Sequence, residues 1–357
     1  MKRIFGYDLI RGIAILLVMI GHVLGYVYSG ANSFFYSFFS GFFGVEFFFV
    51  LSGVLIGKLL INVFNSDNIQ KELKNFLIRR WLRTLPLYFV MLVVYGVGNY
   101  FLDPVKNGDF SVWKYVFFIQ NFFQHQSSFF GVSWSLSIEE WFYILFPAVL
   151  FMIKKLNSEI SSKKLFGIGI FVFISYFLMM RFFAFPEYDF TFYEGIRKIA
   201  FFRLDSIAYG ILTAYGFEYF KDEISSKKYV LLITGIIILF FNQYMVFKSQ
   251  FIDIQYFNTI YFSVLGIGIA MLFPFLQGYV SDNPLIIKSV TFISKISYSL
   301  YLTHWLVYRI LEISYFNFIP GSLKFIIFFI LSFITAAISY QLIEKPIMNY
   351  RNKITRN

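Results

Sequence analysis

The first apolar segment of the chain reads YDLIRGIAILLVMIGH over residues 7–22. Its hydrophobicity predicts a membrane-spanning helix. Arg11 and His22 are costly inside such a helix unless they face a polar cavity or a partner. Eleven residues at about 100° each complete about three turns, so both side chains share one face, about 16 Å apart along the axis. A membrane helix with one polar face of this kind is typical of a membrane active site.

The composition is that of an integral membrane protein. Of the 357 residues, 58% are hydrophobic and only 14% are charged, whereas a soluble domain has about 25% charged residues. The sequence contains no cysteine, which excludes disulfides, thiolate catalysis and cysteine metal sites. The net charge of +11 follows the loops rather than one folded face, so we expect membrane lipids and no nucleic acid as partners.

Apolar runs of spanning length predict an all-α polytopic membrane protein with about ten transmembrane helices. The runs lie near residues 4–28, 40–62, 84–102, 138–153, 165–184, 198–219, 229–247, 256–277, 290–311 and 323–343. The first run has no small-residue cleavage site, so we expect it to be retained rather than removed as a signal peptide. No loop is long enough for a soluble domain, so we expect residues 1–357 to form a single integral membrane domain.

Lysine and arginine are concentrated in alternate loops. Counted from a cytoplasmic N-terminus, they are frequent in the segments predicted to be internal and sparse in the external ones. The positive-inside rule therefore predicts that both termini are cytoplasmic. Arg11 then lies toward the cytosol and His22 toward the outside.

His22 and Arg11 are each open to two interpretations. The imidazole of His22 titrates near neutrality and can accept a proton from a hydroxyl, or it can simply hydrogen-bond two helices together. Arg11 can bind a phosphate or amide of a cytosolic donor, or it can be neutralised by Asp8 three residues earlier on the helix. The shared face favours a functional role for His22.

Glu46 is a carboxylate inside an apolar run that reads GVEFFFVLSG over residues 44–53. A buried carboxylate needs a partner or a proton. Glu46 can orient His22, or it can form a purely structural ion pair with Arg203. The spacing of Gly53 and Gly57 after it predicts close helix packing.

Three arginines, Arg79, Arg80 and Arg83, precede Pro86 on the predicted cytoplasmic side. Such a cluster is explained mainly by topology, because cytoplasmic segments of membrane proteins are rich in lysine and arginine. A cluster this tight can also hold the phosphates of a nucleotide-like cytosolic cofactor.

Glu139 and Glu140 follow Trp134 at the predicted external start of a helix. With Ser137 as the N-cap, acids in the first turn suit the helix dipole. Alternatively, carboxylates and an aromatic ring at an outer mouth suit a sugar-binding site.

Ser297, Tyr301 and His304 are spaced i, i+4 and i+7, so they share a helix face and can line a polar cavity. Other catalytic signals are absent from the sequence: it has no phosphate-binding loop motif and no nucleophile elbow. Its three histidines are widely dispersed, so we expect no metal site.

These residues fall in segments that resemble the membrane acyltransferase-3 family. The opening signature is Tyr7-Asp8-x-x-Arg11-Gly12 followed by His22, a basic residue and a histidine ten residues apart. The other matching segments, in family order, cover residues 44–53, 80–88, 134–143, 203–205, 297–304 and 344–346. The resemblance runs from about residue 5 to 347, and together these motifs are quite specific.

The resemblance implies ten transmembrane helices in a bacterial cytoplasmic membrane. It also implies transfer of an acyl group, usually acetyl, from cytosolic acyl-CoA (acetyl-CoA) to an envelope glycan or lipid-linked saccharide at the outer side. His22 becomes the catalytic residue, as general base or transient acyl acceptor, and Arg11 its companion. Ser297 and Tyr301 match the family's Ser-x-x-x-Tyr element. Glu46 stands where the family more often has aspartate, but it keeps the charge.

Some members of the family carry an extracytoplasmic hydrolase-like domain that completes transfer. This chain ends at residue 357 without one, so we expect it to act alone or with a separate extracytoplasmic transferase. The sequence also leaves open whether the chain forms a homo-oligomer.

A transfer of this kind must bring together a donor and an acceptor from opposite sides of the membrane. We expect Arg79, Arg80 and Arg83 to hold the phosphorylated head of CoA, while the uncharged arm passes Arg11 and reaches His22. The residues expected to bind the acceptor are Trp134, Glu139, Glu140, Ser297, Tyr301 and His304. Of these, Tyr301 and Ser297 are candidates to stabilise the oxyanion. The alternative class is a transporter or flippase of a lipid-linked glycan, which shares the spans and cavity but does not turn over CoA.

Overall fold

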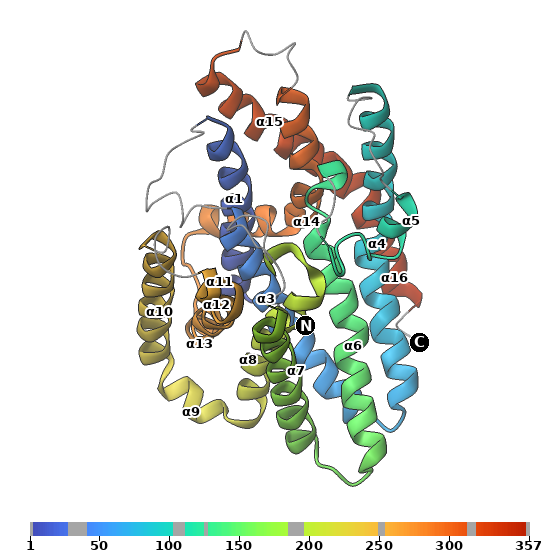
Figure 1. The fold of residues 1–357 in the computed structure, drawn as a ribbon, viewed down its shortest axis with the longest axis vertical. Helices are drawn as coiled ribbons and strands as arrows, with labels where there is room; N and C mark the ends of the chain where they lie inside the picture. The colour runs from blue at the N-terminus through green and yellow to red at the C-terminus, as the bar shows by residue number, and fades with distance from the viewer. Residues whose placement is uncertain are drawn as a thin grey trace.

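The computed structural model describes residues 3–27, 41–102, 111–124, 128–184, 196–248, 254–312 and 319–354. Within these ranges the regular elements are all helices, packed largely along the long axis of the molecule (Figure 1). The longer helices are α1 (Phe5–Val27), α3 (Gly41–Phe64), α4 (Ile69–Leu102), α6 (Trp134–Leu156), α7 (Ser162–Ala184), α8 (Ala208–Tyr219), α10 (Lys228–Lys248), α12 (Tyr261–Ala270), α14 (Pro284–Glu312) and α15 (Gly321–Ser339). The predicted all-α class is therefore confirmed.

Short helices connect or extend these elements. They are α5 (Val112–Val116), α9 (Lys221–Ser226), α11 (Ile254–Thr259), α13 (Phe273–Gly278), α16 (Lys345–Ile354), the 3₁₀ segments η2 (Ser128–Phe130), η3 (Ile196–Lys198) and η4 (Ala200–Ile207), and the π-helical turn η6 (Tyr340–Glu344). Of these, η4 carries the buried polar residues Arg203, Asp205 and Ser206.

Nine segments of the described chain are long and apolar enough to cross a membrane. The predicted run 198–219 is not among them, because it is divided between η4 and α8. Contacts between α1 and α14 advance in the same direction, from Arg11 with Ser294 to His22 with His304, so these two helices run parallel. Parallel helices need an odd number of crossings between them, and six of the nine candidates lie there. We infer that residues 200–219 make the seventh, which brings the crossings within the described residues to the ten that the sequence predicts.

Three of the connections predicted to be internal lie at the same end of the molecule, the lower end of Figure 1. They are the turn after α3, the turn between α6 and α7, and helix α9. This shared position agrees with the alternation of basic loops along the sequence. The cytoplasmic placement of both termini stays a prediction.

Glycines allow α3 and α8 to pack at close range. A Cβ atom on Gly53 would lie 2.1 Å from the carbonyl oxygen of Ile207, and one on Gly57 would lie 2.5 Å from the Cβ of Ala214. The close packing predicted from the glycine spacing is therefore confirmed. This packing fixes the rotation of α3 about its axis, and with it the direction of the Ser52 side chain.

Helix α4 begins well before the apolar run predicted at 84–102. Asn68 accepts a hydrogen bond of 2.9 Å from the backbone N–H of Lys71, the geometry of an N-cap, and the helix continues for 34 residues through Pro86. The charged first turns lower the hydropathy and hide this start from a search for apolar runs. The arginine cluster at 79–83 consequently lies inside a helix, where each side chain has a defined direction.

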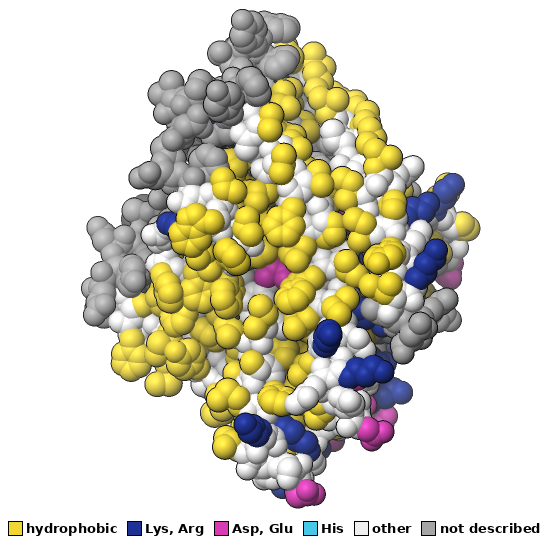
Figure 2. All heavy atoms as spheres, turned by 90° about the vertical axis from the view of Figure 1, so that its right-hand side faces the viewer, with side chains coloured by type: hydrophobic (Ala, Val, Ile, Leu, Met, Phe, Trp, Pro, Cys, Tyr) yellow, Lys and Arg dark blue, Asp and Glu magenta, His cyan; other side chains and the backbone are white. Residues whose placement is uncertain are grey.

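Much of the outer surface is apolar. Figure 2 shows a face on which hydrophobic side chains cover a broad continuous area while Lys and Arg lie toward its margins. Examples of exposed apolar side chains are Val93, Phe171 and Ile237, each more than 60% exposed. Patches of this extent are far larger than a soluble monomer tolerates, as expected of a lipid-facing surface.

Candidate active site

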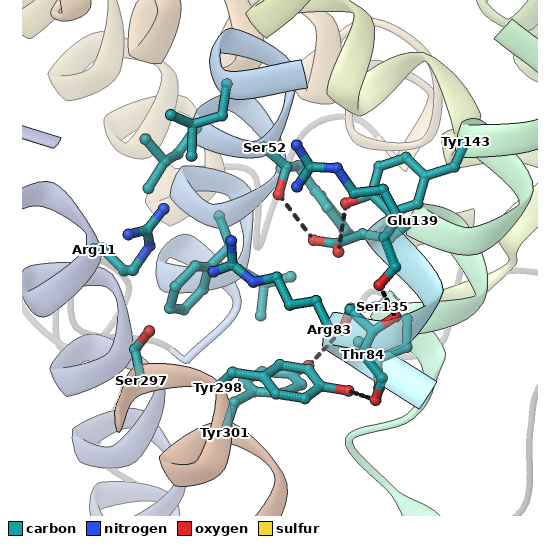
Figure 3. A pocket seen from close by; sticks show the side chains of 17 residues that line it. Arg11, Ser52, Arg83, Thr84, Ser135, Glu139, Tyr143, Ser297, Tyr298 and Tyr301 are labelled. Atoms are coloured by element: carbon teal, nitrogen blue, oxygen red, sulfur yellow. Dashed lines mark hydrogen bonds between the residues drawn. The ribbon is translucent and has the colours of Figure 1, made fainter. Parts of the chain in front are cut away.

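A cavity of about 80 Å³ lies among α1, α3, α4, α6 and α14 (Figure 3). Its polar lining residues are Arg11, Ser52, Arg80, Arg83, Thr84, Ser135, Glu139, Tyr143, Ser297, Tyr298 and Tyr301. Its apolar walls are formed by Val45, Phe48, Phe49, Leu51, Leu55 and Leu136. The structure thus joins residues from five separate motif segments of the sequence in one place.

Three guanidinium groups face this cavity. Arg11 and Arg83 point into it from opposite sides (Figure 3), and the guanidinium carbon of Arg80 lies 5.8 Å from the ring centres of Phe76 and Tyr143. Within the described part of the chain, neither Arg80 nor Arg83 has a carboxylate oxygen within ion-pair distance. The arrangement leaves positive charge available to an anion.

The lining contains one carboxylate, that of Glu139. Its Oε1 accepts a hydrogen bond of 3.2 Å from Ser52, and its Oε2 accepts one of 3.0 Å from the Tyr143 hydroxyl (Figure 3). The donors that hold this carboxylate are neutral hydroxyls, and its single negative charge does not balance the positive charges of the three arginines. The lining therefore carries an excess of positive charge.

Arg11 is only loosely compensated by Asp8. The carboxylate of Asp8 accepts hydrogen bonds of 2.5 and 2.9 Å from Arg3 and one of 2.6 Å from Ser294. Nη1 of Arg11 is 3.7 Å from Asp8 and 3.3 Å from the Ser294 hydroxyl. Because Arg3 takes the closer position on Asp8, much of the charge of Arg11 stays available to the cavity.

Arg79 lies apart from the other two arginines of its cluster. Its side chain is exposed, and it does not line the cavity. Arg80 and Arg83, three residues apart, share a face of α4 and both line the cavity. Arg79 is only about 40° from Arg83 around the helix, so tertiary packing rather than helical spacing leaves it outside the cavity, and the structure separates a trio that the sequence grouped.

His22 lies beyond the cavity, farther along α1. Its Nδ1 is 3.0 Å from Nε2 of His304, and the two rings, with centres 5.1 Å apart and planes inclined by 27°, meet through these nitrogens. The ring of His304 is in turn 6.0 Å from that of Tyr301, which lines the cavity. Both Arg11 and His22 contact α14, so the shared face predicted from their spacing is confirmed. Tyr301 and His304 connect the cavity to His22.

Glu46 does not contact His22. Its Oε1 accepts a hydrogen bond of 2.6 Å from Arg203, and both side chains are almost completely buried. The ring of Phe262 covers the guanidinium of Arg203 at 3.6 Å. Of the two arrangements predicted for Glu46, the structure therefore has the ion pair with Arg203. The side chain that contacts His22 is His304 instead.

The residues predicted at an outer sugar site do not form one site. Trp134 packs against Phe49 and lies 5.6 Å from the guanidinium of Arg197, whereas Glu139 is in the arginine cavity. Glu140 is buried and accepts a hydrogen bond of 2.8 Å from Thr84. The physical reason is helical direction, because five residues turn a helix by about 500° and so place Trp134 and Glu139 on different faces.

The start of α6 also differs from the prediction. The helix begins at Trp134 with Ser133 at the N-cap position, so Ser137 lies in the first turn rather than capping it. Glu139 and Glu140 consequently lie beyond the first turn, where the helix dipole has faded. The dipole is therefore not the reason for these two acids.

Ser297 and Tyr301 line the cavity as the sequence predicted. The Ser297 hydroxyl donates a hydrogen bond of 3.0 Å to the Ser294 carbonyl. The Tyr301 hydroxyl lies 3.0 Å from the Val132 carbonyl and 2.6 Å from the Ser135 hydroxyl. Because both protons are engaged by backbone carbonyls, neither hydroxyl is poised here as the oxyanion donor that the sequence suggested.

Several lining residues were not singled out from the sequence. They are Ser52, Thr84, Ser135, Tyr143 and Tyr298. All five fall inside the motif segments at 44–53, 80–88, 134–143 and 297–304, so the segments carried the signal although the individual residues did not. In the described ranges, no group of three or more potential metal ligands occurs.

Comparison with known proteins gives matches over nearly the whole chain. The sequence profile of acyltransferase-3, described as an acyltransferase domain, matches residues 4–341. A Staphylococcus aureus (strain COL) protein assigned as an O-acetyltransferase is 31% identical over 97% of this chain and 57% of its own length. The peptidoglycan O-acetyltransferase OatA of Listeria monocytogenes is 30% identical over 97% of this chain and 56% of its own length.

The O-acetyltransferase OatA of Staphylococcus aureus (strain NCTC 8325 / PS 47) is 29% identical over 96% of the chain and 57% of its own length. The chain thus spans little more than half the length of these relatives. No solved structure gives a significant match to the chain.

Proposed function

The chain belongs to the acyltransferase-3 family, and on this premise we propose that it is an O-acyltransferase of a bacterial cytoplasmic membrane. It transfers an acetyl group from cytosolic acetyl-CoA to a hydroxyl of a cell-envelope glycan. The similarity to a peptidoglycan O-acetyltransferase supports an envelope polymer as the acceptor. The part of the chain matched by the family profile, residues 4–341, acts as one membrane unit.

The observation that carries this proposal is the unbalanced positive charge of the cavity. Arg11, Arg80 and Arg83 face it with one carboxylate among the lining residues. Partly buried cations without a close carboxylate favour an anionic ligand, and arginine binds phosphate with paired, charge-assisted hydrogen bonds. A volume of about 80 Å³ holds several water-sized groups, enough for a phosphate. The phosphates of CoA are anions of this kind.

His22 performs the proton transfer. As general base it removes the proton of the acceptor hydroxyl, and the oxygen attacks the carbonyl carbon of the thioester. The new C–O bond forms as the C–S bond breaks, and the imidazolium returns the proton to the CoA sulfur. The alternative route passes through an acyl-histidine that the hydroxyl then attacks. In both routes the acyl group travels from the arginine cavity past Tyr301 to His22.

Replacing His22 with alanine tests the proposal. With purified protein, acetyl-CoA and the glycan acceptor, we expect thiol release and ester acetylation to fall by about 100-fold or more, while CoA binding is kept because the arginine cavity is intact. Thiol release is followed colorimetrically and the ester acetyl groups by NMR. Normal acetylation by well-folded His22→Ala protein would remove His22 from the mechanism. Glycan movement without thiol release in the wild type would identify a transporter instead.

A further inference from the structure

The contact between His22 and His304 defines where the protons of both rings lie. Nδ1 of His304 is 2.8 Å from the carbonyl oxygen of Leu300. A carbonyl oxygen only accepts hydrogen bonds, so this nitrogen carries a hydrogen. His304 is fully buried and forms no ion pair with a described carboxylate, so its ring is neutral. A neutral imidazole has a single N–H, which makes Nε2 of His304 an acceptor.

The proton of His22 follows from this assignment. Its Nδ1 is 3.0 Å from Nε2 of His304, and two acceptors cannot share a hydrogen bond, so Nδ1 of His22 is the donor. Nε2 of His22 then holds the free lone pair. Among the described residues, nothing donates a hydrogen bond to that atom, and the side chain of His22 is only partly buried. The basic nitrogen is therefore available to a second substrate.

Aromatic rings of α14 hold the plane of His22. The rings of Trp305 and Tyr308 lie 5.1 and 6.5 Å from it, at interplanar angles of 60° and 45°. Together with the ring of His304 they contact His22 from one helix. The orientation of the imidazole is thus set by α14 and not by Glu46, which is committed to Arg203.

We propose that His304 is a positioning residue that holds His22 in the Nδ1–H tautomer, so that Nε2 of His22 removes the proton of the acceptor hydroxyl. This inference rests on the proposed function. The hydroxyl proton moves to Nε2 of His22, the Nδ1–H of the resulting imidazolium keeps its bond to His304, and the proton later passes from Nε2 to the thiolate of CoA. His304 neither gains nor loses a proton, which is the role of an orienting third group.

Two amide variants of His304 separate this role from simple packing. The amide of glutamine reaches about as far as Nε2 of histidine and offers a carbonyl oxygen to His22. The shorter amide of asparagine reaches only the Nδ1 position and leaves His22 without an acceptor. We expect His304→Gln to keep kcat within about tenfold and His304→Asn to lower kcat by about 100-fold or more. The KM for acetyl-CoA stays within about threefold in both, because the arginine cavity is untouched.

Thr303→Val is the matched control. Thr303 is also buried on α14, and its hydroxyl donates only to the Ser299 carbonyl, at 2.8 Å. We expect wild-type activity from this variant. Equal activity of His304→Asn and wild type, with His22→Ala inactive, would overturn the role of His304 and leave the proposed function standing. Full activity of His22→Ala would instead overturn the proposed function. Equal inactivity of folded His304→Gln and His304→Asn would show that an acceptor is not what His304 supplies.

A measurement on the wild-type chain makes the inference independent of how variants fold. The protein has three histidines, so ¹⁵N-histidine solid-state NMR of the full chain in lipid bilayers resolves few rings, and His22→Gln assigns His22 by difference. We expect a protonated Nδ1 and an unprotonated Nε2 on His22. The opposite tautomer would contradict the proposal.

Discussion

Two groups of arginines in the described chain are held in opposite ways. Beside η4, Arg181 and Arg203 are fully buried, and each meets a carboxylate, at 2.7 Å to Asp205 and 2.6 Å to Glu46. In the cavity, Arg80 and Arg83 have no ion pair within the described chain. The sequence presents all four alike, as cations in or beside apolar runs. Full burial with a carboxylate partner marks the arginines of the scaffold, whereas the partly buried arginines without such a partner line the cavity.

The paired group satisfies its hydrogen-bond donors. Arg181 donates to both oxygens of Asp205, to the carbonyls of Thr259 and Phe202, and to the Ser263 hydroxyl. A guanidinium has five N–H donors, so none is left for a ligand. Arg181 thus holds α7 to η4, α11 and α12 but offers nothing to a substrate. Arg83, which points into the cavity (Figure 3), is the reverse case.

Breaking the scaffold pair should have the largest effect on stability. Arg203→Met leaves Glu46 as an uncompensated buried charge, which costs about 3–5 kcal/mol. We expect a large fall in the unfolding temperature of the detergent-purified protein. The double variant Glu46→Gln/Arg203→Met should recover most of the loss, because no unpaired charge is left. Unchanged unfolding in Arg203→Met, or no recovery in the double variant, would mean that the pair does not hold the fold.

Replacing an arginine of the cavity should change the stability of the protein less than Arg203→Met does, and in the opposite direction. Arg83→Gln removes a cation that repels Arg11 and Arg80, so the ligand-free protein should be as stable as the wild type or up to about 1 kcal/mol more stable. Thermal unfolding without CoA measures this. Arg79→Gln on the exposed face of α4 is the control, with a change within about 0.5 kcal/mol. Destabilisation by Arg83→Gln as large as that by Arg203→Met would place Arg83 in the scaffold.

Helical periodicity explains what the sequence could predict. The apolar runs identify the spans, and the spacing of Arg11 and His22 places both on the face that meets α14. Periodicity does not separate Arg79 from Arg83, which lie four residues apart; the packing of α4, whose start at Ile69 is concealed by its charged first turns, leaves Arg79 exposed. The family motifs marked the segments that form the cavity.

Partner choice could not be predicted from the sequence. Glu46 had two plausible partners, and only the tertiary packing of η4 against α3 assigns it to Arg203. His304 was expected to bind substrate, yet the parallel approach of α1 and α14 brings it against His22. Ser52 and Tyr143, which lie on two different helices, both donate hydrogen bonds to Glu139. Contacts of this kind depend on distances between elements, which a local pattern does not contain.

The most direct test of the account is the equilibrium binding of CoA to the purified wild type, Arg83→Gln and Arg79→Gln. A hydrogen bond to a charged group contributes about 1.5–3 kcal/mol, so we predict that Arg83→Gln weakens binding by about 10- to 150-fold. Arg79→Gln, four residues away on the exposed face of the same helix, should bind like the wild type. Wild-type affinity in Arg83→Gln would contradict the claim that the unpaired arginines of the cavity hold the donor.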